Sequence, residues 1–225
     1  MTRRGIASTL VGAALALVAS GAALAADAWP KREPNAADQA LAKKSIVHIT
    51  DFAPGSGWSK APDSGGSSGM KDPAACKDPA FSDEGRTVTG SASSSFKATG
   101  LQIWSSAEVM QTVAMARQDA DQMRGGPLMP CLRAAFTKGL PKTARLVSVN
   151  RLAFPRIGDW SDAYRALIDV TVTGAKVRLQ VDMVLVLQKR IEITLMQMAP
   201  FAISSIAKTG EVRLAQRLAG PSLSA

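Results

Sequence analysis

The sequence predicts an α+β domain in which an antiparallel sheet of about five to six strands packs against helices on one face. Three observations predict it. The second half of the chain alternates apolar and polar residues with the two-residue period of half-buried strands, separated by short polar turns. Two helical patterns precede these strands and a third follows them. No internal repeat interrupts the 225 residues, which are expected to hold one such domain.

The first 26 residues have the layout of a secretory signal peptide. Arg3 and Arg4 form a charged start, an apolar run spans residues 6–18, and Ala23-Leu24-Ala25 offers a small-residue cleavage site. The run is too short and too rich in Ala and Gly for a comfortable membrane span. Residues 27–225 are therefore expected to be secreted or associated with the cell envelope, with no stable span after cleavage. If the signal is retained, it is an N-terminal anchor instead.

Polar and turn-forming residues dominate the start of the mature chain. The segment at 59–80 is rich in Gly, Ser, Pro and Asp, which predicts a flexible loop. The expected order is a polar tail at 27–35, a short helix or strand at 36–49, a turn at 51–58, this loop, and an extended segment at 86–104.

Two helices are expected in the middle of the chain. Ser105 to Glu108 matches a capping box, so the first helix is predicted to begin there and to end at Gly125. The second helix is predicted at 129–138, where Gly139 supplies a left-handed C-terminal position.

Strands and a final helix fill the rest. The predicted strands lie at 144–154, 164–172 and 177–187, and a last one begins at Ile191 and ends at Pro200. Met196 and Met198 have the opposite parity to Ile191, Ile193 and Leu195, so that strand is predicted to be apolar on both sides. Thr209 can cap the helix that closes the domain.

Cys76 and Cys131 are the two cysteines of the chain. An even pair in an exported protein favours a disulfide, which stabilises a loop of this length by about 4 kcal/mol. The competing interpretation, a metal-binding or catalytic thiol, lacks a zinc-type spacing, and the single histidine has no ligand partner nearby in sequence. No metal and no cofactor are expected.

The chain is basic. Without the two signal arginines, 25 Lys and Arg face 18 Asp and Glu, a net charge of +7. A generic solubility charge is one interpretation, and a positive binding face for an envelope polymer or a partner protein is the other. The charges form no single block, and no nucleic-acid partner is expected. The candidate basic face consists of Arg145, Arg151, Arg156 and Arg165.

Three motifs that resemble catalytic sites have plainer interpretations. The string at 65–69 matches a nucleophile elbow but lies in a Gly/Ser-rich loop, with the only histidine on the wrong side of it in sequence. His48 stands in an apolar run and is expected to be a packed or capping residue. Asp159 and Asp162 flank Trp160 as turn residues do. No catalytic residue is therefore expected, and the protein is predicted not to be an enzyme.

Methionines recur on the predicted core helices and strands. Methionine adapts to irregular apolar shapes, so these residues either fill the core or line a cavity for a hydrophobic ligand. The candidate ligand-binding residues, two tryptophans included, are Trp104, Met123, Trp160, Met183, Met196 and Met198.

Several short motifs resemble an actinobacterial envelope domain. They are the Asp51–Trp58 segment, a Cys in a Pro-rich loop, a Ser-rich strand, the Trp104–Glu108 segment, a second Cys, and a hairpin centred on Arg190. Together, over residues 36–220, they are similar to the extracellular sensor domain of mycobacterial PknH-type kinases, and more loosely to LpqN-type secreted lipoproteins. The kinase sensors carry two disulfides whereas this chain can form one, and no kinase domain, transmembrane helix or lipobox accompanies it.

The resemblance implies an α+β sandwich with a cleft, and a ligand-binding or sensing role without an assigned ligand or catalytic residue. The leading hypothesis is a secreted, non-enzymatic envelope domain that binds a lipid or other amphiphile in an apolar cleft, with Arg and Lys at the rim for an anionic head group. The alternative is an interaction module that binds an anionic wall polymer or a partner protein through its basic face.

Overall fold

A computed structural model describes residues 30–61, 85–125, 128–200 and 204–220, without side chains at 204–209. The predicted signal peptide, Cys76 and the string at 65–69 lie outside these residues. Within them, no helix is both long and apolar enough to cross a bilayer.

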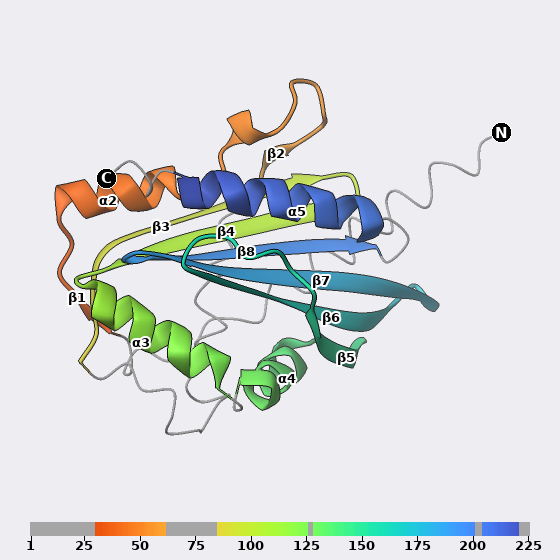
Figure 1. Cartoon of the computed structure of the whole chain (residues 1–225). Helices are drawn as coiled ribbons and strands as arrows, with labels where there is room; N and C mark the ends of the chain where they lie inside the picture. Colours follow the sequence, from red (N-terminus) through yellow and green to blue (C-terminus); the bar gives the residue numbers. More distant parts are fainter. Residues whose placement is uncertain (1–29, 62–84, 126–127, 201–203, 221–225) are drawn as a thin grey trace.

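The strands form one eight-stranded mixed sheet in the order β1-β3-β4-β8-β7-β6-β5, with β2 on β3 (Figure 1). Every pair is antiparallel except β1 with β3. The expectation of about five to six strands was too low, because two two-residue strands paired with β3 add to the six long ones. The strands are β1 (Lys31–Arg32), β2 (Ser59–Lys60), β3 (Thr87–Ala98), β4 (Leu101–Met110), β5 (Ala144–Leu152), β6 (Trp160–Val172), β7 (Ala175–Gln188) and β8 (Ile191–Pro200).

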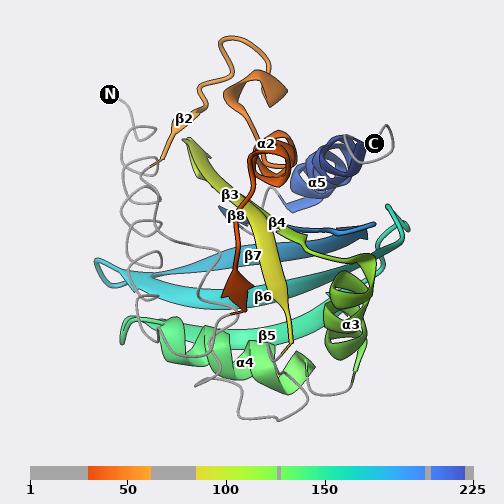
Figure 2. The ribbon, with the colours of Figure 1, turned by 90° about the vertical axis from the view of Figure 1, so that its left-hand side faces the viewer.

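Helices cover both faces of this sheet, so the expectation of helices on one face was wrong. Helices α2 and α5 lie on one face, and α3 and α4 lie on the other (Figures 1 and 2). The central strands carry apolar residues on both sides, and a sheet of that kind needs cover on both. The helices are α2 (Ala36–Lys44), the short 3-10 turn η1 (Ile49–Asp51), α3 (Val113–Arg124), α4 (Leu128–Gly139) and α5 (Ser204–Ala219).

Strand β8 shows why the sheet needs helices on both faces. Ile191, Ile193 and Leu195 pack in the cluster beneath α2 and α5. Met196 and Met198 belong to the cluster on the α3 and α4 face. The prediction that this strand is apolar on both sides is confirmed.

The predicted helix start at Ser105 was wrong. Residues 101–110 form β4, and α3 begins only at Val113, where the Thr112 side chain accepts from the Met115 N–H. The Ser105 hydroxyl is buried and accepts the Val47 N–H at 2.8 Å. Because that hydroxyl accepts a hydrogen bond from Val47, in the segment that follows α2, it does not cap a helix.

An ion pair joins α2 to the turn between β7 and β8. Both guanidinium nitrogens of Arg190 donate to the Asp38 carboxylate, at 2.8 and 3.0 Å, and one of them also donates to the Met110 carbonyl. Thr89 and Asn35 donate to the same carboxylate. The Arg190 hydrogen bond holds the pKa of Asp38 well below its ordinary value of 3.8, despite the burial of the carboxyl.

Replacing this carboxylate by Asp38→Asn is expected to lower the unfolding free energy at neutral pH by about 2 kcal/mol. A depressed pKa contributes stability that is complete above the unfolded value and is lost as the pH falls toward the folded one. Below about pH 4, the stability of the wild type should therefore fall more steeply with pH than the stability of the variant does. Urea unfolding at several pH values measures this. Asp121→Asn, at an exposed ion pair on α3, is the control, and equal effects of both would contradict the prediction.

Candidate functional site

The six candidate ligand residues all belong to the apolar cluster on the α3 and α4 face. Three of them form a continuous line across the sheet. Met183 of β7 lies opposite both Tyr164 of β6 and Met196 of β8. Met196 lies in turn opposite Trp104 of β4. We call these four residues the methionine row, and it crosses the middle of the face that α3 and α4 cover.

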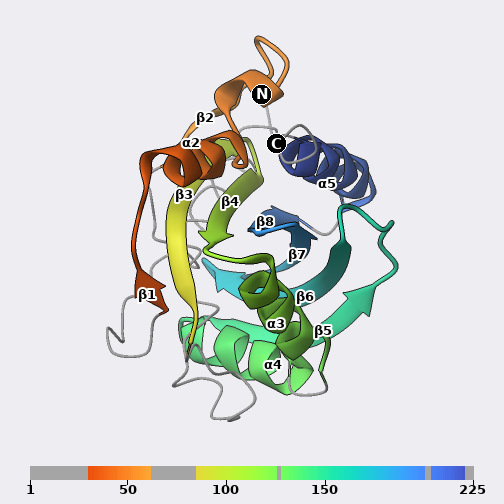
Figure 3. The ribbon, with the colours of Figure 1, turned by 60° about the vertical axis from the view of Figure 1, so that its left-hand side comes forward.

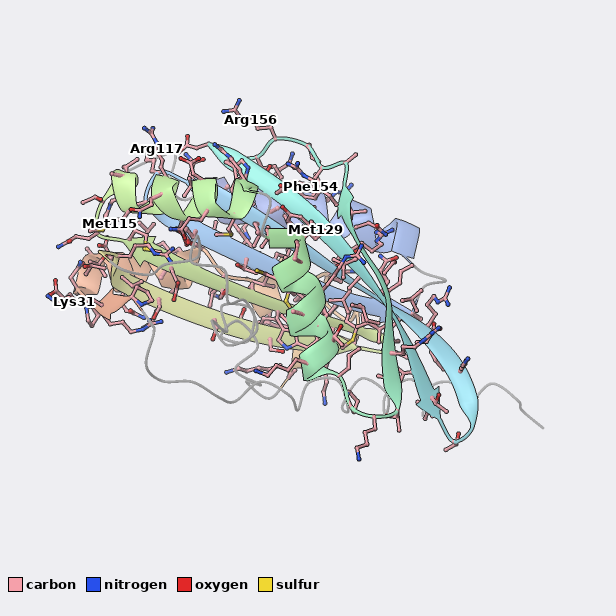
Figure 4. All side chains as sticks on the ribbon, turned by 90° about the horizontal axis from the view of Figure 1, so that it is seen from below. Lys31, Met115, Arg117, Met129, Phe154 and Arg156 are labelled. Carbon is pink, nitrogen blue, oxygen red and sulfur yellow. The ribbon has the colours of Figure 1, made fainter. Side chains whose placement is uncertain are left out.

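Three members of the row are buried, and one, Met196, is partly exposed. Met183 and Met198 are 1% exposed, whereas Met196 and Met123 are only partly buried. Figure 4 looks onto this face and shows α3 and α4 lying across it. The helices add further partly buried methionines to the cluster, Met115 and Met129 among them. In this structure the row therefore fills the core, and a ligand there has to displace side chains.

A shallow groove of about 700 Å³ runs along the outer side of α3. Its described lining comes from α3 itself and the glycine after it, and includes Val113, Arg117 and Asp121. None of the six candidate residues is among that lining, so this groove is separate from the methionine row.

Polar side chains continue the same face beside the row. Ser106 lies opposite Thr194, and Glu108 lies opposite Glu192, across the β4–β8 ladder. All four are partly exposed, and we call them the polar stripe. Arg32 of β1 donates to Glu108 at 3.1 Å and so offsets part of its charge. Sequence reasoning missed the stripe because it placed Ser106 and Glu108 on a helix; their two-residue spacing from Trp104 was the available signal.

Trp160 lies at the other side of the face, beside a buried carboxylate. Asp162 accepts from Arg151 Nε at 2.6 Å and from the Tyr164 hydroxyl at 2.8 Å. Burial and then this hydrogen bond raise the pKa of Tyr164, so its hydroxyl stays protonated. The Arg124 guanidinium lies 5.4 Å from the Trp160 ring. These contacts hold a neutral phenol and an ion pair in place, and Asp162 acts there as their acceptor.

The four candidate arginines do not share one face. The β5–β6 register shifts between Leu146 and Ser148, which reverses the parity of β5. Arg145 consequently lies near Asp169 on the face of α2 and α5, and Arg151 lies on the opposite face.

Aspartate side chains also pair with three of these four arginines. Arg165 makes two hydrogen bonds to Asp182, at 2.7 and 2.6 Å, while Arg145 and Arg151 have the partners just named. Arg156 donates to the Asp159 carbonyl. The four residues therefore provide no concentrated positive surface.

The other sequence candidates are separate from this face. His48 is exposed, and its ring lies 2.8 Å from the Lys43 carbonyl. Cys131 lies on α4, and its predicted partner is outside the described residues, so the disulfide stays a prediction. The described part of the chain holds no group of three or more His, Cys, Asp or Glu that could bind a metal ion.

Comparison with known proteins adds little. No protein-family model matches the chain, and no curated protein matches it. A solved structure of an uncharacterised protein from Mycobacterium smegmatis is 13% identical, with a TM-score of 0.35, over 65% of this chain and 75% of that one. A likeness this weak decides neither the fold family nor the function.

Proposed function

We propose that this protein is an exported, non-enzymatic domain of the cell envelope that binds a lipid or another amphiphile between α3 and the sheet. One observation carries the proposal: Met196, the partly buried member of the methionine row, lies directly beside Thr194 of the polar stripe. An apolar surface that adjoins hydroxyl and carboxylate groups suits a ligand with an apolar chain and a polar head.

The side chains of the methionine row support the same proposal. Methionine side chains have three rotatable bonds and adapt to a new neighbour better than branched ones. The alternative, a basic interaction face, loses support because aspartates pair with three of its four arginines.

Native mass spectrometry of the exported protein, followed by organic extraction, tests the proposal. The wild type is expected to carry a discrete amphiphile or to take one up from a lipid extract of its host. Met196→Gln is expected to lower occupancy about tenfold, because an amide buried against an apolar chain costs about 1–3 kcal/mol. Protection from a thiol reagent would test the Cys76–Cys131 disulfide in the same sample.

Leu214→Gln is the matched control. Leu214 is likewise partly buried, but it lies on α5 in the cluster of the opposite face. Leu214→Gln should leave the ligand occupancy unchanged. A wild type that stays free of ligand in the presence of the extract, or equal losses in the two variants, would overturn the proposal.

A further inference from the structure

Residues 48–58, which we call the Ile49 loop, project beyond α2 and α5. Figures 1 and 3 both show this segment as an outward extension between α2 and β2, on the side of the molecule away from α3 and α4. Gly55 and Gly57 adopt left-handed φ angles of 74° and 78°, which let the chain turn at its tip.

One large aliphatic side chain is exposed on this loop. Ile49 is 49% exposed. Among the described residues, the other large apolar side chain with a high exposure is Val147 on β5. Ala53 and Pro54 are exposed on the same loop, together with the polar residues His48, Thr50 and Ser56. One exposed isoleucine is ordinary on a protein surface, but here it lies on a projecting segment with further apolar neighbours.

The loop is held in a fixed shape from below. Phe52 stacks on Trp58 with ring centroids 4.3 Å apart, and its edge meets Phe96 of β3 at 5.5 Å. Arg217 of α5 donates to the Ile46 carbonyl at 2.8 Å and pairs with Asp51. Because the aromatic rings turn inward, the loop presents Ile49 at little entropic cost on binding.

Exposed lysines flank this loop in sequence on both sides. Lys43 and Lys44 are exposed at the end of α2, and Lys60 is exposed on β2. Asp51 is the only acidic residue between positions 43 and 60, and Arg217 neutralises it. The region therefore combines an exposed aliphatic side chain with a net positive charge.

We propose that the Ile49 loop docks the protein on an anionic lipid bilayer. Ile49 and Pro54 enter the boundary between head groups and acyl chains, and the lysines contact the anionic head groups. A convex loop of this size offers less area than the roughly 800 Å² per partner of a stable protein interface, and its aromatic residues are not available as anchors. A lipid surface, which yields to a small wedge, fits it better than an acidic protein does.

Vesicle flotation of the full chain tests the docking. Vesicles of phosphatidylcholine alone are compared with vesicles of equal parts phosphatidylcholine and phosphatidylglycerol. The wild type is expected to float only with the second kind, and to detach as salt screens the charges. Lys43→Gln with Lys44→Gln should weaken binding about 25-fold, since each lysine near an anionic surface contributes about fivefold. Ile49→Ser should weaken it about tenfold.

Two matched controls make the result specific. Val147→Ser removes the other exposed apolar side chain, and Lys142→Gln with Lys176→Gln removes two exposed lysines elsewhere. Both should bind as the wild type does. Equal losses in the controls, or no loss in the loop variants, would overturn the proposal. Failure to float together with binding to polyglutamate would overturn it too, in favour of an acidic protein. Met196→Gln should still float, which separates this result from the amphiphile site.

Discussion

Asp119→Ala is expected to lower the unfolding free energy by about 3–5 kcal/mol. Asp119 of α3 forms an ion pair with Arg86 at the start of β3, and their side chains are only 4% and 3% exposed. Burial already lowers the pKa of the Arg86 guanidinium, although Glu192 and Glu108 act in the opposite direction. Removal of the paired carboxylate leaves that buried charge without the partner that forms its ion pair, which is the costly case for a buried ion pair.

Replacing both partners distinguishes this explanation from a general packing loss. Arg86→Met with Asp119→Leu should recover most of the lost stability, because apolar residues of similar volume replace a buried pair at little net cost. Asp121→Ala, at an exposed pair on the same helix, should change stability by less than about 1 kcal/mol. Urea unfolding measures all three. A double variant no more stable than Asp119→Ala would contradict the assignment.

The sequence predicted the second half of the fold well because its strands alternate regularly. The four strands β5 to β8 follow one another with short turns, and the parity of Met196 against Leu195 correctly placed them on opposite faces. The same rule failed on β5, where one extra residue near Val147 reverses the parity. A periodic pattern does not reveal the position of a bulge. The placement of Arg145 and Arg151 on opposite faces could therefore not be predicted.

The first half was harder because local and long-range interactions compete there. Ser105 to Glu108 has the residues of a helix start, yet Ser105 bonds to Val47, which lies 58 residues away in sequence. A local motif cannot reveal such a partner. The pairing of Arg165 with Asp182 is similar: it depends on the register of β6 against β7, which the sequence alone does not specify. The pairing of Arg165, one of the four arginines of the predicted basic face, was therefore not foreseen.

Gly90→Ala is expected to destabilise the protein by about 2–3 kcal/mol, although alanine usually stabilises a helix or strand interior relative to glycine. A β-carbon at this position of β3 would lie 2.3 Å from the Asp38 carbonyl oxygen and 2.8 Å from the Gln39 nitrogen. These are backbone atoms of α2, so no side-chain rotation relieves the overlap and the helix has to move away from the sheet.

Gly210→Ala on α5 should have the opposite sign, a gain of up to about 1 kcal/mol, because nothing lies within 4 Å of a β-carbon there. Thermal unfolding of the two variants measures the contrast. A shift of α2 also disturbs the Asp38–Arg190 pair, since Asp38 belongs to the segment that Gly90 touches. The combined variant Asp38→Asn with Gly90→Ala should therefore lose less stability than the sum of the single changes. Strict additivity would mean that α2 accommodates the alanine without moving its carboxylate.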